Sequence, residues 1–227
     1  MGAAGLAWAG PMLADRVLFL DGEALVIDKP AGLPVDRPRD GSLSLENHLD
    51  YLAFGFRRWP TPVHRLDRDT SGCLLLARNP KTRARFQQAF EAGTVEKLYL
   101  AVLEGVPDVE SGLIELPLAK ISGEASGWRM RGDTRGKPAR TGWRLLRTEG
   151  GRSLVEFRPA TGRTHQIRVH AAEALGAPVV GDPVYGRPDP RGMLLHAHKL
   201  VVPRASKPPV AAEAPVPERF GAFRDPA

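Results

Sequence analysis

Short turns between apolar segments constrain the fold of this chain more than any other feature. The stretch "RVLFLDGEALVIDKPAGLPV" contains two expected strands, Val17 to Leu20 and Ala24 to Asp28, joined by an Asp-Gly turn. A turn this short makes the two strands antiparallel, because a parallel connection needs a dozen or more residues. A second hairpin is expected around the Glu-Gly-Gly of residues 149–151. The pattern predicts an α+β fold with a mixed, mostly antiparallel sheet flanked by helices and loops.

Several other stretches have distinct signals. "CLLLAR" is a continuous apolar run, typical of a strand buried on both faces. "NPKTRARFQQAFEAG" predicts a helix with Asn79 as its N-cap, Pro80 in its first position and Gly93 past its end. "EKLYLAVLEG" alternates like a strand, and "MLLHAHKLVV" predicts a late strand. Helices are also expected in "SLSLENHLDYLAF" and in "TGRTHQIRVHAAEALG".

The size and cysteine content suggest one domain in a reducing compartment. The chain has 227 residues, enough for one sizeable core. We expect a poorly ordered lead-in over residues 1–16 and a folded domain over residues 17–227. The single cysteine, Cys73, excludes an intramolecular disulfide, so we expect a cytoplasmic protein. No segment approaches the ~18 apolar residues of a membrane span, and no membrane association is expected.

The charge pattern indicates a polyanionic partner. The formal net charge is +6 and the sequence pI is about 9.8. From Arg57 to Lys97 there are nine Lys and Arg against four Asp and Glu, and from Arg129 to Arg168 eleven against three. Most of these cations are arginines, whose planar fork suits phosphates and base stacking. We therefore expect a cationic surface built from these two segments, although solvated faces would show the same pattern.

Common catalytic patterns are missing. The histidine pairs His165/His170 and His196/His198 have no accompanying cluster of carboxylates or thiols, so no metal site is expected. Neither a GxxxxGK[ST] nor a GxGxxG phosphate loop occurs. Cys73 begins a strand that is expected to be buried, which disfavours a nucleophilic role.

The stretch "PVHRLDRDTSG" places two aspartates among arginines. Asp67 and Asp69 could be the carboxylate pair of a glycosidase, but the neighbouring Arg65 and Arg68 favour the ionised forms, which cannot act as the acid. The alternative is one charged aspartate in a basic cleft, suited to nucleophilic or electrostatic work at a sugar carbon. Asp67 could also do no more than cap a turn.

Eight motifs follow one another in a familiar order. "HRLDRDTSGCLLLA" resembles the signature of the RluA-type pseudouridine synthases, and it is preceded by "VIDKPAGLPV". It is followed by "EKLYLAVLEG", "GKPARTGW", "RPATGRTHQIRVHAA", "VVGDPVYG", "LLHAHKL" and "APVPERF", so that the resemblance runs from Val17 to Phe220. It implies an isomerase that converts uridines of rRNA or tRNA to pseudouridine without cofactor or metal. It also implies that the Pro-rich C-terminal segment is part of the folded domain.

The resemblance assigns roles to individual residues. Asp67 matches the catalytic aspartate, which attacks the ribose or the uracil or assists elimination to a glycal; the sequence leaves these three routes open. Tyr99 matches the tyrosine that stacks on the uracil, although it could be an ordinary half-buried strand residue. Arg168 matches the basic partner of the aspartate, and Arg65 the residue that enters the RNA stack when the uridine flips out. Leu195 is expected against the base, with Leu194 nearly as well placed.

Two stretches depart from the family pattern, and they concern the choice of RNA. "GLPVDRPR" stands where "GLPVHP" is typical, and "VVPRASKPP" replaces the usual His-Pro. The resemblance begins almost at residue 17, so no S4-type RNA-binding domain is expected in front. We expect a monomer with no obligatory protein partner. Two rival functions stay open: an RNA-binding protein without turnover, and an N-glycosidase that releases free uracil.

Overall fold

The computed structural model describes residues 13–38, 40–123 and 127–225, and the chain divides into two compact units. Unit 1 contains Met1–Glu96 and Lys199–Pro215, and unit 2 contains Lys97–His198 and Val216–Ala227. Most of the expected lead-in, residues 1–12, lies outside the described residues. Leu13 follows it and is fully buried.

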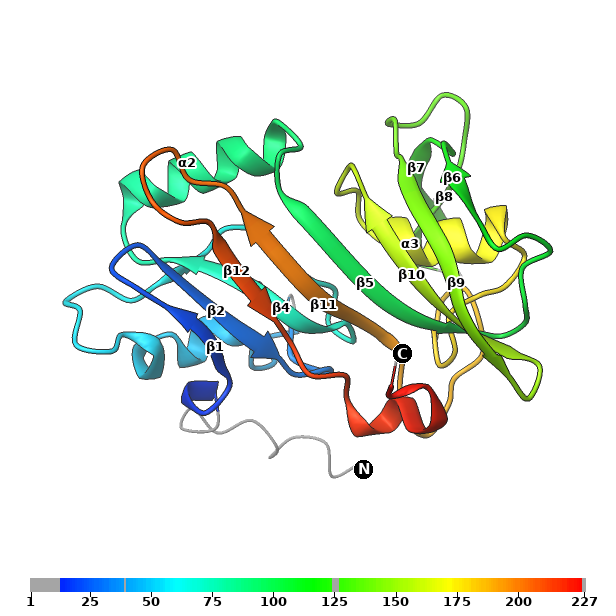
Figure 1. The fold of residues 1–227 in the computed structure, drawn as a ribbon, viewed down its shortest axis with the longest axis horizontal. Coiled ribbons are helices and arrows are strands. Elements are labelled where there is room, and N and C mark those ends of the chain that lie inside the picture. Colours follow the sequence, from blue (N-terminus) through cyan, green and yellow to red (C-terminus); the bar gives the residue numbers. More distant parts are fainter. Residues whose placement is uncertain (1–12, 39, 124–126, 226–227) are drawn as a thin grey trace. The chain divides into compact units, whose positions relative to one another are not determined.

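Unit 1 is built on an antiparallel sheet and contains helix α2 (Pro80–Glu91) (Figure 1). The expected first hairpin is confirmed as β1 (Val17–Leu20) and β2 (Ala24–Lys29), and β2 pairs in turn with β4 (Ser71–Ala77). Every residue of β4 is buried, as its apolar run predicts, and the two-residue β3 (Thr61–Pro62) pairs with it. Helix α2 also follows the prediction, since the side chain of its N-cap Asn79 accepts the amide of Thr82 at 2.9 Å.

The C-terminal Pro-rich segment is folded, as the family resemblance implied. It forms β12 (Val210–Glu213), which pairs with the second half of β11 (Leu195–Val202). Val210 is fully buried in the same apolar cluster as β2 and β4. Arg204 donates to the Asp21 carboxylate at 2.6 Å, joining this segment to the turn between β1 and β2.

Unit 2 contains an antiparallel sheet in the order β5 (Glu96–Leu103), β10 (Arg152–Pro159), β9 (Thr141–Glu149) and β6 (Ser111–Ile114). The expected hairpin around residues 149–151 is the turn between β9 and β10. Alternation along β5 distributes its side chains between two apolar clusters, as expected. One cluster contains Leu98, Leu100 and Val102, and the other contains Tyr99, Ala101 and Leu103.

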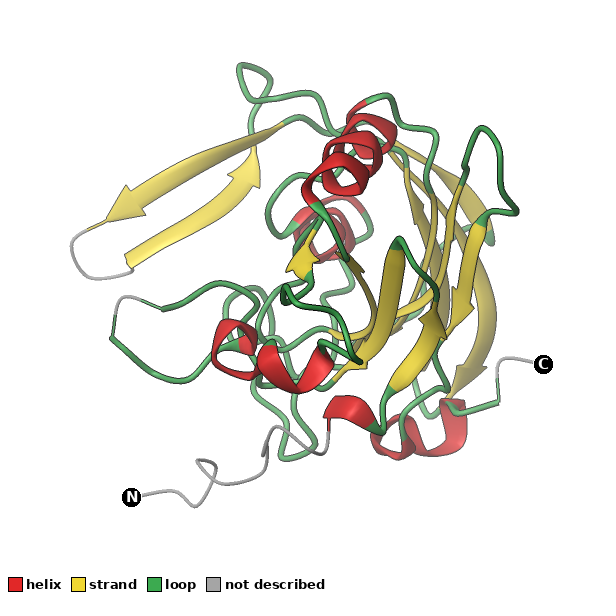
Figure 2. Cartoon of the chain, turned by 90° about the vertical axis from the view of Figure 1, so that its left-hand side faces the viewer, coloured by secondary structure: helices red, strands yellow, loops and turns green. Residues whose placement is uncertain are grey.

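A second hairpin of unit 2 was not expected from the sequence. Strands β7 (Leu118–Gly123) and β8 (Gly127–Gly132) form their own two-stranded sheet, seen in Figure 2 as a separate ribbon. The segment is rich in Gly, Ser and charged residues, and its apolar alternation is short, as in the four residues 128–131, Trp-Arg-Met-Arg. Its pairing therefore has to be read from the structure.

Both of the less regular helices differ from the expectation. In place of one helix over "SLSLENHLDYLAF" there are two 3₁₀ turns, η1 (Leu45–His48) and η2 (Asp50–Leu52), because Asn, His, Asp and Tyr form helices poorly. "TGRTHQIRVHAAEALG" begins its helix only at α3 (Gln166–Val169), which continues as the π-turn η3 (His170–Ala174). The Gln166 side chain delays the start, since it accepts from the Thr161 hydroxyl at 2.7 Å and keeps the preceding residues in a loop.

The last helical turns are η4 (Glu218–Phe223), in which Phe220 is fully buried among the apolar residues of unit 2. The sheets and the few helices together confirm the expected α+β class. In the described part of the chain, no helix combines the length and the apolar character needed to cross a membrane.

Candidate active site

The loop that carries Asp67 lies in unit 1, between β3 and β4. Asp67 is half-buried and Arg65 is exposed, while Leu66 between them is buried. The amide of Thr70 donates to the backbone carbonyl of Asp67 at 3.2 Å, which closes a turn before β4. The predicted catalytic aspartate therefore lies in a short turn directly joined to a fully buried strand.

The fully buried side chain of Lys29 holds this loop by hydrogen bonds. Lys29, the last residue of β2, donates through its Nζ to the backbone carbonyls of Pro30 at 2.8 Å, Leu33 at 2.8 Å and Arg68 at 3.0 Å. The amide of Gly32 also donates to the Arg68 carbonyl, at 2.9 Å, with Gly32 itself at a φ of +84°. These bonds bind the Lys-Pro-Ala-Gly turn to the residue immediately after Asp67.

Lys29→Met should loosen the loop without removing a catalytic group. We expect the free energy of unfolding to fall by about 1–3 kcal/mol, because three buried carbonyls lose a charged donor. Urea unfolding measures this, and Lys81→Met on the exposed face of α2 is the matched control, expected to change stability by less than about 0.5 kcal/mol. A Lys29 variant as stable as the control would show that the lysine does not hold the loop.

Arg65 has an ion-pair partner in a second loop. Its Nη1 lies 2.8 Å from Oδ2 of Asp36, and both side chains are more than half exposed. Asp36 belongs to "GLPVDRPR", the stretch that departs from the family pattern. An exposed pair of this kind contributes only ~0–1 kcal/mol, so a stronger anion can displace it.

Tyr99, Leu195 and Arg168 lie in unit 2. Tyr99, half-buried on β5, packs against the apolar cluster that contains Leu195 and Ile167. Leu194 belongs to the other cluster, with Phe220. Of the two leucines that the sequence left open, Leu195 is thus the one that shares a cluster with Tyr99.

Arg168 is held by a carboxylate whose importance the sequence did not indicate. Its Nε and Nη2 donate to Oδ2 and Oδ1 of Asp182 at 2.7 and 2.8 Å, and the two side chains are only 6% and 0% exposed. Burial raises the pKa of Asp182, but the Arg168 guanidinium and the amides of Val184 and Tyr185 outweigh it, so the pKa lies below its ordinary value. The result is a fixed, ionised pair.

Residues around this pair connect it to the unexpected hairpin. The guanidinium carbon of Arg168 lies 5.2 Å from the ring centroid of Tyr185, whose hydroxyl accepts the amide of Met130 in β8 at 2.9 Å. The same hydroxyl lies 2.9 Å from Nδ1 of His165, and the His165 ring stacks on Trp128 at 5.2 Å. Strand β8 of the hairpin is therefore tied to the loop before α3.

Two further histidines and the cysteine have structural surroundings that account for them. His64 accepts the amide of Leu75 through Nε2 at 3.0 Å and stacks on Phe90. Burial lowers the pKa of His170, and its Nε2 must carry the proton, because it faces the carbonyl of Leu116 at 3.0 Å. Burial raises the pKa of the Cys73 thiol to about 12, so the thiolate needed for nucleophilic attack is not populated near neutral pH.

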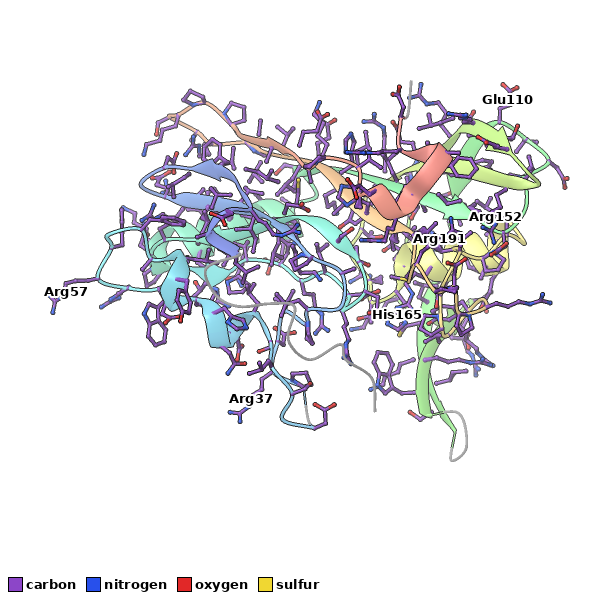
Figure 3. The ribbon with its side chains drawn as sticks, turned by 90° about the horizontal axis from the view of Figure 1, so that it is seen from below. Arg37, Arg57, Glu110, Arg152, His165 and Arg191 are labelled. Atoms are coloured by element: carbon purple, nitrogen blue, oxygen red, sulfur yellow. The ribbon has the colours of Figure 1, made fainter. Side chains whose placement is uncertain are left out.

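The two basic segments differ once their partners are known. In the segment from Arg129 to Arg168, most arginines lie within 4.0 Å of a carboxylate, which reduces the cationic surface expected there. In the other segment, Arg57 and Arg58 are exposed and form no ion pair with any residue that the structure describes. Figure 3 shows Arg57 pointing away from the ribbon at the end of its loop.

Three residues with clear structural work were given no role by the sequence analysis: Lys29, Asp182 and Tyr185. All three lie in "VIDKPAG" and "GDPVYG", two of the motifs that carry the family resemblance. Their place in these motifs was the signal by which the sequence could have identified them. Gly181 precedes Asp182 with a φ of +77°, and a side chain there would collide with the carbonyl of Gly192. The predicted site residues fall into two sets, Arg65 and Asp67 in unit 1 and Tyr99, Arg168 and Leu195 in unit 2.

Sequence comparison places the chain in one family. The family described as RNA pseudouridylate synthase matches residues 23–173. An uncharacterized RNA pseudouridine synthase of Zymomonas mobilis is 61% identical over 92% of this chain and 97% of its own length. The ribosomal large subunit pseudouridine synthase C of Rickettsia bellii is 36% identical over 86% of this chain, which spans 65% of that protein.

Solved structures agree with the sequence relatives. Human RNA pseudouridylate synthase domain containing 4 has a TM-score of 0.77 at 25% identity and covers 93% of this chain and 94% of its own. Human RNA pseudouridylate synthase domain containing 1 also has a TM-score of 0.77, at 30% identity, and covers 92% of this chain and 86% of its own. The chain therefore belongs to the RNA pseudouridylate synthase family, as an RluA-type RNA pseudouridine synthase and hence an isomerase.

Proposed function

We propose that this enzyme isomerises specific uridines of rRNA or tRNA in the cytoplasm, with Asp67 as the catalytic group and without cofactor. Asp67 attacks the ribose or the uracil, or assists elimination to a glycal, so that the bond between N1 of the uracil and the ribose breaks. The uracil then rejoins through C5, the C5 proton is removed with Tyr99 as the candidate base, and N1 takes up a proton. Residues 17–227 supply the catalytic part, and the protein acts as a monomer. The observation that carries the proposal is the Asp67 turn itself, which is hydrogen-bonded to the buried Lys29 through the Arg68 carbonyl and leads directly into the buried strand β4.

The other residues have supporting roles in this proposal. Tyr99 stacks on the detached uracil and Leu195 packs against it, which fits their shared apolar cluster. Arg168 orients the Asp67 carboxylate, which suits a guanidinium already fixed by Asp182. Arg65 enters the RNA stack in place of the flipped uridine, a role for a planar cation.

The test compares RNA from cells with and without the gene. Pseudouridines are labelled with carbodiimide and located by primer extension across ribosomal and transfer RNAs. A stop that disappears on deletion should return with the wild-type gene and stay absent with Asp67→Ala. A stop restored equally by both genes would contradict the role of Asp67, and free uracil released by the purified enzyme would favour an N-glycosidase.

Arg65→Ala tests the flipping role separately. We expect turnover on a structured RNA to fall by at least ~10-fold, with a smaller loss on a flexible single-stranded loop, where less unstacking is required. Asp36→Ala is the control, because it removes the partner of Arg65 and keeps the arginine. Equal losses on the two RNAs would contradict intercalation by Arg65.

A further inference from the structure

Residues 51–59 of unit 1, hereafter the aromatic loop, expose four aromatic rings within nine residues. Tyr51 is 49% exposed, Phe54 39%, Phe56 44% and Trp59 61%. Isolated exposed apolar residues are ordinary, but a cluster of large rings in one short loop indicates a binding surface.

The fold holds this loop in place. The amide of Phe56 donates to the carbonyl of Ala53 at 3.0 Å, closing a turn whose central residues, Phe54 and Gly55, have φ values of +44° and +81°. A phenylalanine in the left-handed region costs roughly 1–2 kcal/mol, and such strain persists only where the surroundings enforce it.

A buried arginine, Arg78, stabilises this strained turn. Arg78, only 5% exposed, donates through Nη2 to the carbonyls of Ala53 at 2.8 Å and Phe54 at 3.3 Å. Its guanidinium carbon also lies 3.6 Å from the ring centroid of Phe56. The rings are therefore presented by a rigid loop, which lowers the entropy lost when a ligand binds.

The charged residues beside the exposed rings indicate which class of ligand the loop binds. Arg57 and Arg58 lie between Phe56 and Trp59, both exposed and without an ion pair among the residues described. The carboxylate of Asp50 borders the loop at its other end, beside Tyr51. Exposed rings interleaved with unpaired arginines fit a single-stranded nucleic acid, whose bases stack while its phosphates bind the cations.

The loop and the Asp67 turn lie at opposite ends of β4. β3, which follows Trp59, pairs with Leu76 and Ala77, whereas the Asp67 turn closes just before Ser71, so the length of the strand, ~20 Å, separates them. We propose that the aromatic loop binds single-stranded RNA a few nucleotides away from the target uridine, with a base stacked on Trp59 and phosphates on Arg57 and Arg58. This inference rests on RNA being the substrate, as in the proposed function.

The test measures the binding of labelled oligouridine and of an abasic ribose-phosphate strand of the same length, by fluorescence anisotropy at several salt concentrations. Trp59→Ala should weaken oligouridine binding ~10-fold and leave the abasic strand within about 2-fold of wild type, because only bases stack. Arg57→Gln with Arg58→Gln should weaken both strands and reduce the slope of log K against log salt by about 1.4.

Two substitutions in unit 2 are matched controls. Val109→Ala removes an exposed apolar side chain, and Arg147→Gln removes an arginine that is paired with Glu149. Both should bind the two strands like wild type.

Several results would overturn the inference. The inference is wrong if Trp59→Ala weakens the binding of both strands equally or weakens neither. It is also wrong if the wild-type protein binds neither strand at low salt. Dissociation of a dimer by Trp59→Ala would assign the loop to a second copy of the chain, and loss of binding to anionic vesicles alone would assign it to a membrane. The proposed function fails independently, if the enzyme shows the expected binding pattern and isomerises no RNA.

Discussion

Asp67→Ala is expected to abolish pseudouridine formation by the purified enzyme while RNA binding stays within about 3-fold of wild type. Removing a group that attacks the substrate lowers turnover by at least about three orders of magnitude, whereas phosphate contacts are made by other residues. Asp67 is half-buried in a surface turn, so the variant should fold. Single-turnover assays with carbodiimide detection measure the rate, and anisotropy measures binding.

Asp69→Ala is the matched control for this prediction. Asp69 is also half-buried, lies two residues away in the same turn and carries the same charge. We expect its variant to retain turnover, because the proposed mechanism needs one aspartate. Inactivity of both variants would instead support a pair of carboxylates, and turnover by Asp67→Ala above the level of RNA alone would contradict the mechanism.

Asp182→Ala is expected to lower the free energy of unfolding by about 3–5 kcal/mol, because it removes the buried carboxylate that accepts two hydrogen bonds from the Arg168 guanidinium. Arg168 is 6% exposed, and the amides of Val184 and Tyr185 would lose their acceptor at the same time. Urea unfolding measures the loss. Turnover should fall in parallel, since Arg168 would lose its fixed orientation.

A surface ion pair provides the comparison. Glu149 and Arg147 are 2.8 Å apart with both side chains 46% exposed, so Glu149→Ala should cost less than about 1 kcal/mol. The double variant Asp182→Leu with Arg168→Met should lose less stability than the sum of its single variants, because both members of the buried pair are removed together. Additive losses would show that the two side chains are not energetically coupled.

The Asp182 carboxylate also predicts a dependence on pH. Its folded-state pKa lies below the ordinary value, so its contribution to stability is fully present above the unfolded-state pKa and is lost as the pH falls through the folded-state pKa. The stability advantage of wild type over Asp182→Asn should therefore decrease below about pH 4. Unfolding curves at several pH values check this, and an advantage that grows on acidification would contradict the assignment.

Much of the fold was predictable because local signals and tertiary context agree. Residues 17–29 formed the expected hairpin, and Asn79 with Pro80 began the expected helix, because a turn or a cap depends on only a few neighbouring residues. The apolar run at residues 73–77 lies in a fully buried strand, as a short uninterrupted apolar segment predicts. The order of the motifs was enough to indicate the family.

The elements that local sequence patterns did not predict depend on contacts between side chains that are distant in the sequence. The hairpin of β7 and β8 has only a short apolar alternation, and it is joined to distant residues, since Gly132 donates to Glu173 and Met130 to Tyr185. The helix expected in "TGRTHQIRVHAAEALG" begins only at Gln166, whose side chain also donates to the carbonyl of Arg140, 26 positions away. No helical or strand period encodes such contacts.

The sequence by itself determined the α+β class, the enzyme family and the candidate residue Asp67, since each depends on local patterns or on motifs in order. Only the tertiary structure decided what holds the candidate groups: Lys29 beneath the Asp67 turn, Asp182 behind Arg168, and Arg78 beneath the exposed rings of residues 51–59. A buried charge must find partners wherever the folded chain offers them, because leaving it unpaired is costly. Those partners lie up to 39 residues away, and no spacing in the sequence identifies them.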